Sequence, residues 1–321
     1  MEIEGNLLIV AVDIGGTQIR VAILNENFEI LGRESGPTGF DSDPLIVCMQ
    51  MMHMIRSVKG KSEWGRVLGV GISAPTVDRR TGRFVNPPNL PRWHDFSISD
   101  FINDELDLPV SVSNDASLAA LGESRFGAGV GVNDMLYYTL STGVGGGIIV
   151  DGKLYEGQTG FAGELGHITV NPNGPICNCG NRGCLETYAS GPAIAQAGSR
   201  AVEMGKNTCL SREGTISTED VFGAALSGDQ VCKEIVQNAG KYLAIGITGA
   251  MHMFEPERIV IGGGVSAGFG QMRPHIDRYI SQHAMAHFYG KMDIRLSELG
   301  DDSALIGAAC HLKDNYFAER T

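Results

Sequence analysis

The sequence predicts an α/β protein of two domains in which one structural plan occurs twice. Two stretches, 7–23 and 137–150, each contain an apolar run of strand length, a glycine-rich turn and a second strand-like run. With 321 residues, 43% of them hydrophobic, the chain is long enough to build two cores. The repeat therefore suggests a duplicated domain with phosphates held between the two copies.

The first hairpin begins with the apolar run LLIVAV at 7–12 and turns at the segment DIGGT, 13–17. Glycines in a turn leave successive backbone N–H groups exposed, and such groups can cradle phosphate oxygens without a lysine. Asp13, at the end of the strand, would face the phosphates and could hold Mg²⁺ through water. For this segment alone, an ordinary hairpin turn is the alternative.

The second hairpin has its glycines at 143–147, between the strand-like runs 137–142 and 148–150. A third glycine run, 262–264, follows the apolar segment RIVI at 258–261. Its bare backbone would let a nucleotide base or ribose approach closely. All three glycine runs follow predicted strands, and strand ends are where α/β sheets place ligands.

Between the hairpins, the segment 44–58 has the apolar spacing of a helix, which Ser42 or Asp43 would cap. The proline-stiffened loop 86–93 either presents Asn89 to a ligand or serves only as a connection. The helix is expected to pack into the core through the stripe Leu45, Cys48, Met49, Met52 and Ile55.

Two further strands are predicted at 67–72 and 109–113, and the second ends in Asn114-Asp115 before a helix at 116–125. An aspartate at a strand end can accept the proton of a substrate hydroxyl that attacks a phosphate. The alternative is that Asp115 only caps the helix. Two phosphate-binding hairpins in the same chain favour the catalytic interpretation.

The segment 164–186 gathers a histidine, three cysteines and two carboxylates in a short window. The cysteines have the spacing C-x-C-x4-C, and the histidine lies ten positions before the first of them. Three thiolates and one imidazole make a closed tetrahedral set for Zn²⁺, which is typical of a structural site. Reduced thiols in a tight loop are the alternative. The candidate ligands are His167, Cys177, Cys179 and Cys184.

Glu164 and Glu186 flank this loop on either side. If His167 gives one ring nitrogen to zinc, its other nitrogen becomes a fixed donor. Rigidly held carboxylates beside such a donor are suited to gripping sugar hydroxyls. The alternative is that both glutamates are solvated loop residues.

The chain after the cysteines is predicted to be largely helical. The domain boundary is expected near 115–127, giving a smaller domain at 1–118 and a larger one at 119–302. A C-terminal helix at 303–321 is expected to pack back on the smaller domain. The remaining histidines have no ligand spacing and are expected to be structural or exposed. The predicted helices cover 191–206, 218–226, 229–252, 272–285 and 303–315.

The composition excludes several classes of partner. A formal net charge of −12 and a pI near 5.1 argue against nucleic acid and against an anionic membrane surface. No apolar run approaches the ~18 to 20 residues of a membrane span. The acidic start MEIEG is unlike a signal peptide, and scattered cysteines are typical of core thiols. We therefore expect a cytoplasmic protein.

Several motifs together resemble those of the ROK family of sugar kinases and sugar-responsive repressors. In chain order across nearly the whole sequence they are DIGGT, PNL, ND, STGVGGG, E-x-G-H, C-x-C-G-x-x-G-C-x-E and GGG. The resemblance implies a duplicated actin-like, hexokinase-like (ribonuclease H-like) two-domain α/β fold. It also implies a central cleft that holds ATP and a sugar.

Carried over residue by residue, the resemblance makes Asp115 the catalytic base. It implies the sugar contacts Asn89, Asn114, Asp115, Glu164, His167 and Glu186. It implies the zinc ligands His167, Cys177, Cys179 and Cys184. It implies nucleotide and phosphate contacts at Asp13, Gly15, Gly16, Thr17, Thr142, Gly143 and Gly263.

The function so implied is transfer of the γ-phosphoryl group of ATP, with Mg²⁺ and a structural Zn²⁺, to the 6-hydroxyl of an aldohexose. Glucose is the favoured sugar, and fructose, mannose, N-acetylmannosamine and N-acetylglucosamine are its rivals. A sugar-sensing protein without catalysis is the alternative from another class. A homo-oligomer, either a dimer or a tetramer, is also expected from the resemblance.

Overall fold

The structure is a computed structural model that describes residues 7–39, 41–59, 66–87, 89–211, 214–288, 290 and 292–318. It divides into two compact units. Unit 1 comprises Met1–Gly131, Gly147–Gly163 and Glu298–Thr321, and unit 2 comprises Val132–Gly146 and Glu164–Ser297. The domain division expected from the sequence stays a prediction. Residues 1–6 of the smaller domain, Pro88 of the proline loop and 319–321 of the last helix lie outside the described residues.

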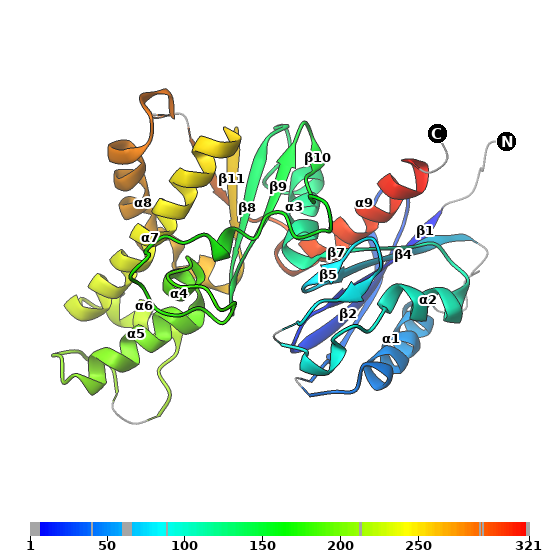
Figure 1. Cartoon of the computed structure of the whole chain (residues 1–321), viewed down its shortest axis with the longest axis horizontal. Helices are drawn as coiled ribbons and strands as arrows, with labels where there is room; N and C mark the ends of the chain where they lie inside the picture. The colour runs from blue at the N-terminus through cyan, green and yellow to red at the C-terminus, as the bar shows by residue number, and fades with distance from the viewer. Residues whose placement is uncertain are drawn as a thin grey trace. The chain divides into compact units, whose positions relative to one another are not determined.

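Unit 1 is built on a five-stranded mixed sheet with the strand order β3-β2-β1-β4-β7 (Figure 1). The first three strands pair antiparallel, whereas β4 and β7 continue the sheet parallel to β1. The predicted hairpin around DIGGT is therefore confirmed as β1 and β2. The strands are β1 (Leu8–Ile14), β2 (Gln18–Leu24), β3 (Ile30–Pro37), β4 (Val67–Ala74) and β7 (Val110–Asn114).

One face of this sheet packs on α1 (Pro44–Lys59), and the alternation of the strands supplies the apolar side chains for it. The predicted helix is confirmed, but its buried stripe is partly wrong. Leu45 and Met49 are 53% and 69% exposed. The helix is rotated so that Val47 and Met51 pack into the core instead.

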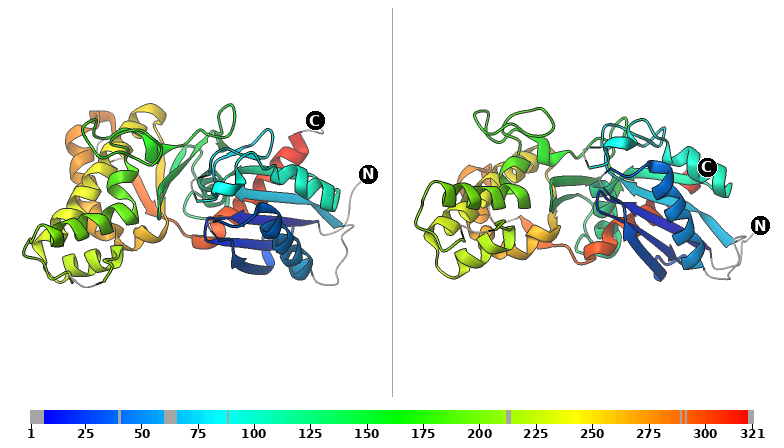
Figure 2. Two further views of the ribbon diagram at one scale, coloured as in Figure 1. Left: turned by 60° about the horizontal axis from the view of Figure 1, so that its bottom comes forward. Right: turned by 90° about the horizontal axis from the view of Figure 1, so that it is seen from below.

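The opposite face of the sheet is covered by α9 (Ser303–Ala318), which also packs along α3 (Asp115–Phe126) (Figure 2). The helix lies so close to the strands that a methyl group on Gly71 of β4 would collide with the backbone oxygen of Ala308. Small residues at such positions let the backbones approach. The last helix therefore supplies part of the core of unit 1.

A buried carboxylate joins two distant segments of unit 1. Glu123 is 0% exposed, and its Oε2 accepts hydrogen bonds from the backbone N–H groups of Ala128 (2.8 Å) and Glu298 (3.2 Å). Its Oε1 accepts from the N–H of Leu299 at 2.9 Å. The hydrogen bonds of this one side chain join the segment after α3, where the chain leaves unit 1, to residues 298–299, where the chain returns to it.

A second five-stranded sheet has the order β10-β9-β8-β11-β12. Strands β8, β11 and β12 run parallel in unit 2, and β9 begins in unit 2 and ends in unit 1, where it pairs antiparallel with β10. The order repeats that of the first sheet, which confirms the predicted duplication of an α/β plan. The strands are β8 (Met135–Leu140), β9 (Val144–Val150), β10 (Lys153–Leu154), β11 (Arg258–Gly262) and β12 (Asp293–Leu296).

The second glycine run differs from the prediction, because Gly145, Gly146 and Gly147 lie within β9 and only Gly143 belongs to the turn. A Cβ on Gly147 would collide with Ala120 of α3. The last of these glycines therefore allows a strand and a helix to pack closely.

The helices of unit 2 follow the predicted order, with boundaries shifted by a few residues. Short polar side chains cap them, as Asp229 does by accepting from the N–H of Cys232 at 3.0 Å. Among the described residues, none of the helices combines the length and the apolar composition that a bilayer crossing requires. The helices are α4 (Glu186–Ala189), α5 (Gly191–Glu203), α6 (Thr218–Leu226), α7 (Gln230–Phe254) and α8 (Phe269–His283).

The short elements of unit 1 were not predicted from sequence patterns. These are β5 (Val77–Asp78), β6 (Arg83–Phe84) and α2 (Ile98–Leu106), which Ser97 caps. Five 3-10 helices complete the described structure: Pro91–Trp93, Leu165–His167, Gly264–Gly268, Ala286–Phe288 and Gly300–Asp302.

Candidate functional site

The parallel strands of unit 1 bring polar side chains to the same edge of the sheet. Asp13 of β1 pairs in register with Ser73 of β4, which pairs with Ser113 of β7. Asn114 and Asp115 come directly after Ser113. The carboxyl ends of parallel strands are the usual place for ligand chemistry in an α/β sheet. The register therefore aligns the end of β1, which leads into the glycine turn, with the predicted base.

Asp13 is a buried carboxylate, only 8% exposed. The Ser73 hydroxyl donates to its Oδ1 at 2.6 Å, and Nη1 of Arg20 donates to its Oδ2 at 3.3 Å. Burial raises the pKa of Asp13 above its ordinary value, although both hydrogen bonds act in the opposite direction. Neither partner was predicted from the sequence, because Ser73 is 60 positions away and Arg20 faces Asp13 only through the pairing of β1 with β2.

The glycine turn of the first hairpin is tight, since the N–H of Gly15 donates to the carbonyl of Gln18 at 2.8 Å. Gly16 packs against the side chain of Asn89, and a Cβ at this glycine would meet the Asn89 Cβ at 2.5 Å. The structure thus brings together one predicted phosphate contact and one predicted sugar contact. Thr17 is exposed at the same turn.

Asn114 and Asp115 share the first turn of α3. The Asn114 Oδ1 caps the helix, accepting from the N–H groups of Ala116 (3.0 Å) and Ser117 (3.3 Å). The capping role weighed for Asp115 therefore falls to the residue before it. The Oδ1 of Asp115 accepts from the N–H of Ala116 at 2.7 Å, which fixes the carboxylate at the end of β7.

In unit 2, the predicted zinc ligands form a single cluster. One ligand atom from each of the four residues lies within 4.8 Å of all the others. Cys179 Sγ and Cys184 Sγ are 3.7 Å apart, and Cys177 Sγ is 3.7 Å from His167 Nδ1. Two sulfurs at ~2.3 Å from a tetrahedral zinc are separated by about 3.8 Å. The donor set and its spacing therefore fit a closed Zn²⁺ site.

Backbone turns make this convergence of sulfurs possible. Gly180 and Gly183 have φ values of +88° and +70°, which favour glycine. The N–H of Gly180 donates to the carbonyl of Cys177 at 2.9 Å, so the chain reverses between the first and last cysteines. Burial raises the pKa of the Cys177 thiol to about 12, so the fold by itself leaves this sulfur protonated. A bound cation would be needed to hold the thiolate.

The two nitrogens of His167 face different groups. Nδ1 faces the sulfurs, whereas Nε2 lies 3.8 Å from Oε2 of Glu164. Burial raises the pKa of Glu164, and the charge of Glu186 adds to this effect, while His167 lowers it. The two glutamates are thus close enough to influence each other electrostatically.

Glu186 also holds the turn between β8 and β9. Its Oε2 accepts from the N–H of Val144 at 3.1 Å, and a Cβ on Gly143 would meet the same oxygen at 2.5 Å. Thr142 of this turn is exposed. Gly263 has a φ of +83°, and a Cβ added there would collide with the carbonyl of Leu140 at the end of β8. Close backbone packing alone accounts for this glycine.

Three residues that the sequence did not single out anchor the loop that carries the candidate zinc ligands. Nδ2 of Asn171 donates to the hydroxyls of Tyr188 (2.9 Å) and Tyr242 (3.2 Å), whose rings stack at 3.7 Å. Gly183 packs against the carbonyl of Asn171. Because Tyr242 is on α7, no local pattern could have predicted this support.

The predicted site residues thus form two groups. The group in unit 1 comprises Asp13, Gly15, Gly16, Thr17, Asn89, Asn114 and Asp115, and the group in unit 2 comprises Thr142, Gly143, Glu164, His167, Cys177, Cys179, Cys184, Glu186 and Gly263.

Comparison with known proteins gives matches along nearly the whole chain. The ROK family pattern matches residues 9–315. A glucokinase from Halalkalibacterium halodurans is 36% identical over 315 residues, which are 95% of this chain and 94% of that protein. A xylose repressor from Caldicellulosiruptor bescii is 31% identical over 307 residues, covering 93% of this chain and 76% of that protein.

Among solved structures, a ROK family glucokinase from Streptomyces griseus in complex with glucose and AMPPNP is similar, with a TM-score of 0.78 and 32% identity. The match covers 94% of this chain and 98% of that chain. The similarity agrees with the repeated α/β sheets and with the order of the motifs. The chain belongs to the ROK family.

Proposed function

We propose that the protein is a sugar kinase that transfers the γ-phosphoryl group of ATP to the 6-hydroxyl of glucose. The observation that carries this proposal is the position of Asp115, directly after β7, at the edge where β1 leads into the glycine turn. Phosphoryl transfer to an alcohol needs a base and a phosphate-binding turn close together. Similarity to a glucokinase over 95% of the chain supports the same reaction.

In this mechanism Asp115 accepts the proton of the sugar 6-hydroxyl. The hydroxyl oxygen of the sugar attacks the γ-phosphorus, and ADP leaves. The N–H groups of Gly16 and Thr17 cradle the phosphates from one turn, and Gly15, whose N–H donates to Gln18, holds the shape of that turn. When bound, Mg²⁺ supplies neutralisation of charge on the phosphate oxygens, and Asp13 is the residue that would hold it through water. We assign further phosphate and nucleotide contacts to Thr142, Gly143 and Gly263.

We assign the sugar to Asn89, Asn114, Glu164, His167 and Glu186. The Oδ1 of Asn114 is engaged by the helix N-terminus, so its Nδ2 is the group available to a sugar oxygen. His167 Nε2 would donate to a hydroxyl, because Nδ1 points into the sulfur cluster. In this proposal Zn²⁺, held by His167, Cys177, Cys179 and Cys184, is structural.

Glucose is proposed over fructose, mannose, N-acetylmannosamine and N-acetylglucosamine because similar proteins from two organisms are glucokinases. The test is ADP release with ATP, Mg²⁺ and each of these five sugars. We expect glucose to give the highest kcat/KM. A higher value with another sugar would reassign the substrate and leave the reaction class intact.

Asp115→Asn is expected to lower kcat by about 10²- to 10⁴-fold, the usual contribution of a general base, while glucose binding measured by calorimetry persists. The matched control is Asp104→Asn, which changes an exposed carboxylate of α2 in the same unit. If Asp115→Asn keeps the wild-type kcat, the assignment of the base is wrong.

A sugar-sensing protein without catalysis is the second candidate, because a xylose repressor is similar along 93% of the chain. The same assay separates the two candidates. Binding of a sugar without ADP release for any sugar would favour the sensor.

We also propose that the enzyme works in the cytoplasm as a homo-oligomer, a dimer or a tetramer. All seven cysteines are free thiols in the structure, as expected in a reducing compartment. Light scattering coupled to size-exclusion chromatography measures the subunit number, and a mass of 34.2 kDa would identify a monomer.

A further inference from the structure

A pocket of about 630 Å³ lies in unit 1 at the outer edge of β7, the last strand of the first sheet. Its volume is within the usual range for small-molecule sites. Four segments line it: the turn 79–83, the first turn of α2, the strand residues 110–112, and His311 and Asn315 of α9. None of the residues assigned to the kinase site is among them.

The lining is rich in hydrogen-bond donors and carries an excess of positive charge. Three arginines, Arg79, Arg80 and Arg83, meet a single lining carboxylate, Asp100. Such a cluster is notable in a chain with a net charge of −12. The pocket also adjoins the N-terminal turn of α2, where the helix dipole favours an anion.

The three arginines differ in how well they are already paired. Arg80 lies 3.1 Å from Asp78, and Arg83 donates to the backbone oxygen of Asp95 at 2.7 Å. Within the described part of the chain, the contacts of the Arg79 guanidinium are long, 3.5 Å to the backbone oxygen of Gly157 and 3.9 Å to Glu156 Oε2. Its guanidinium is therefore the one best able to take a further acceptor.

The floor of the pocket is a built hydrogen-bond network. Ser111 and His311 are 7% and 5% exposed, and the Ser111 hydroxyl lies 2.5 Å from His311 Nδ1. His311 Nε2 lies 3.2 Å from Glu156 Oε2, which fixes the ring. Asn315 Nδ2 donates to the Ser111 hydroxyl at 3.3 Å. Buried polar groups held in this way keep a fixed geometry toward a ligand.

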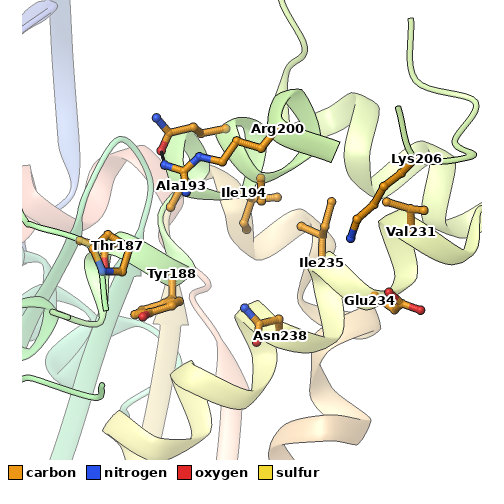
Figure 3. Close-up of a pocket in the computed structure, with 13 residues that line it drawn as sticks. Thr187, Tyr188, Ala193, Ile194, Arg200, Lys206, Val231, Glu234, Ile235 and Asn238 are labelled. Carbon is orange, nitrogen blue, oxygen red and sulfur yellow. Dashed lines mark hydrogen bonds between the residues drawn. The ribbon is translucent and has the colours of Figure 1, made fainter. Parts of the chain in front are cut away.

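Another pocket, of about 280 Å³ in unit 2, has a smaller excess of positive charge (Figure 3). Its lining mixes Lys206 with Glu234 and the apolar residues Ile194 and Ile235, and Arg200 is already bonded to a glutamine at 2.7 Å. The mixture selects no class of ligand. The arginine-rich pocket of unit 1, in contrast, selects one.

We propose that the arginine pocket binds a small phosphate monoester, with Arg79 as its main contact. A guanidinium offers phosphate a planar fork of donors, and phosphate has enough acceptor oxygens to engage the neighbouring Asn315 as well. A carboxylate group has fewer acceptor oxygens than a phosphate group. A neutral sugar would add no negative charge to a lining in which three arginines meet one carboxylate.

The network also provides a connection to the base that the proposed function assigns, and this part of the inference rests on that function. Glu156 Oε1 accepts from the Ser113 hydroxyl at 2.6 Å, and Ser113 precedes Asn114 and Asp115 at the end of β7. A bound phosphate that displaces the Arg79 guanidinium from Glu156 changes the electrostatic environment of this carboxylate. Because Glu156 accepts from Ser113, the change reaches the end of β7. The ligand would therefore act as an effector of the kinase.

The experiment measures binding by calorimetry, without ATP or sugar, with three probes of matched body: glycerol 3-phosphate, glycerate and glycerol. We expect glycerol 3-phosphate to bind and the other two to bind at least tenfold more weakly. Arg79→Gln is expected to weaken binding about 10- to 100-fold, as the loss of a charge-assisted pair does. The control Arg33→Gln, an exposed arginine paired with Asp302 at 2.8 Å, should bind normally.

Absence of binding, equal binding of glycerate, or equal binding by Arg79→Gln would overturn the site. A thermal melt of each variant checks its fold, and Asn315→Ala provides a second variant that should also weaken binding. For the effector role, saturating glycerol 3-phosphate should change kcat or KM at least twofold in the wild type and leave Arg79→Gln unchanged. Binding without this change would overturn the effector role. Binding that is seen although the protein phosphorylates no sugar would separate failure of the proposed function from failure of this site.

Discussion

Replacing Glu123 with glutamine is expected to destabilise unit 1, although the change removes a buried negative charge. The carboxylate accepts three backbone N–H groups, two on Oε2 and one on Oε1. An amide has one acceptor oxygen and an NH₂ group that only donates. In Glu123→Gln the amide oxygen can replace Oε2, but the NH₂ group then faces the N–H of Leu299. Two buried donors, this N–H and the NH₂ group, are therefore left without acceptors.

The magnitude follows from that count. Each buried donor without an acceptor costs about 1–3 kcal/mol, so two such donors lower the free energy of unfolding by about 4 kcal/mol. For a unit of this size, ~1 kcal/mol corresponds to about 2–4 °C in Tm. We therefore expect Glu123→Gln to lower Tm by roughly 12 °C.

The assay is thermal unfolding followed by circular dichroism, supported by urea titration. Glu257→Gln is the matched control, because Oε1 of this exposed side chain accepts two backbone N–H groups and an amide oxygen can replace it. A Tm for Glu123→Gln within about 2 °C of the control would refute the reasoning, since it would mean that the orphaned donors find other acceptors.

Three further predictions concern the site and its supporting packing. Cys184→Ser should purify with less than half the zinc of the wild type by elemental analysis, whereas Cys209→Ser, outside the cluster, should keep it; zinc-free wild type would contradict the metal site. Burial raises the pKa of Asp13, so the favourable contribution of this group to the free energy of unfolding is complete below its ordinary pKa. That contribution is lost as the pH rises through the raised pKa. Asp13→Asn should therefore raise Tm at pH 8 by more than at pH 4 while abolishing ADP release, and an equal shift at both pH values would argue against the burial effect. Gly71→Ala, which places a methyl against the backbone of α9, should cost about 1–3 kcal/mol, whereas Gly249→Ala, in open space on α7, should gain about 0.5–1 kcal/mol by urea titration; equal effects would exclude close packing as the cause.

Local patterns predicted the parts of the fold that neighbours along the chain determine. The first hairpin follows from the alternation of residues around DIGGT, and α6 begins and ends where its spacing predicts. The second glycine run was interpreted less well, because a run of glycines has the same appearance in a turn and in a closely packed strand. The space available to Gly147 depends on Ala120, which sequence spacing does not reveal.

The buried side of α1 shows another limit of pattern. Leu45 and Met49 satisfy helical spacing as well as Val47 and Met51 do, and the position of the sheet decides which pair is covered. A helix that is apolar on several sides carries too little contrast to fix its own rotation.

The convergence of the four candidate zinc ligands could be predicted because they lie within one short window whose spacing fits the coordination of one ion. The partners of the candidate catalytic residues could not. Ser73, whose hydroxyl donates to Asp13, is 60 positions away, and the parallel register of β1 with β4 brings the two side chains together. Such pairs leave no trace in the local sequence.

The location of α9 has a consequence for how the protein is made on the ribosome. This helix covers one face of the first sheet, yet it is translated after every residue of unit 2. The β strands of unit 1 therefore leave the exit tunnel early and wait, with one face uncovered, while the rest of the chain is synthesised. Unit 1 completes its interior only near the end of synthesis, and until then chaperones that recognise apolar strands have a substrate.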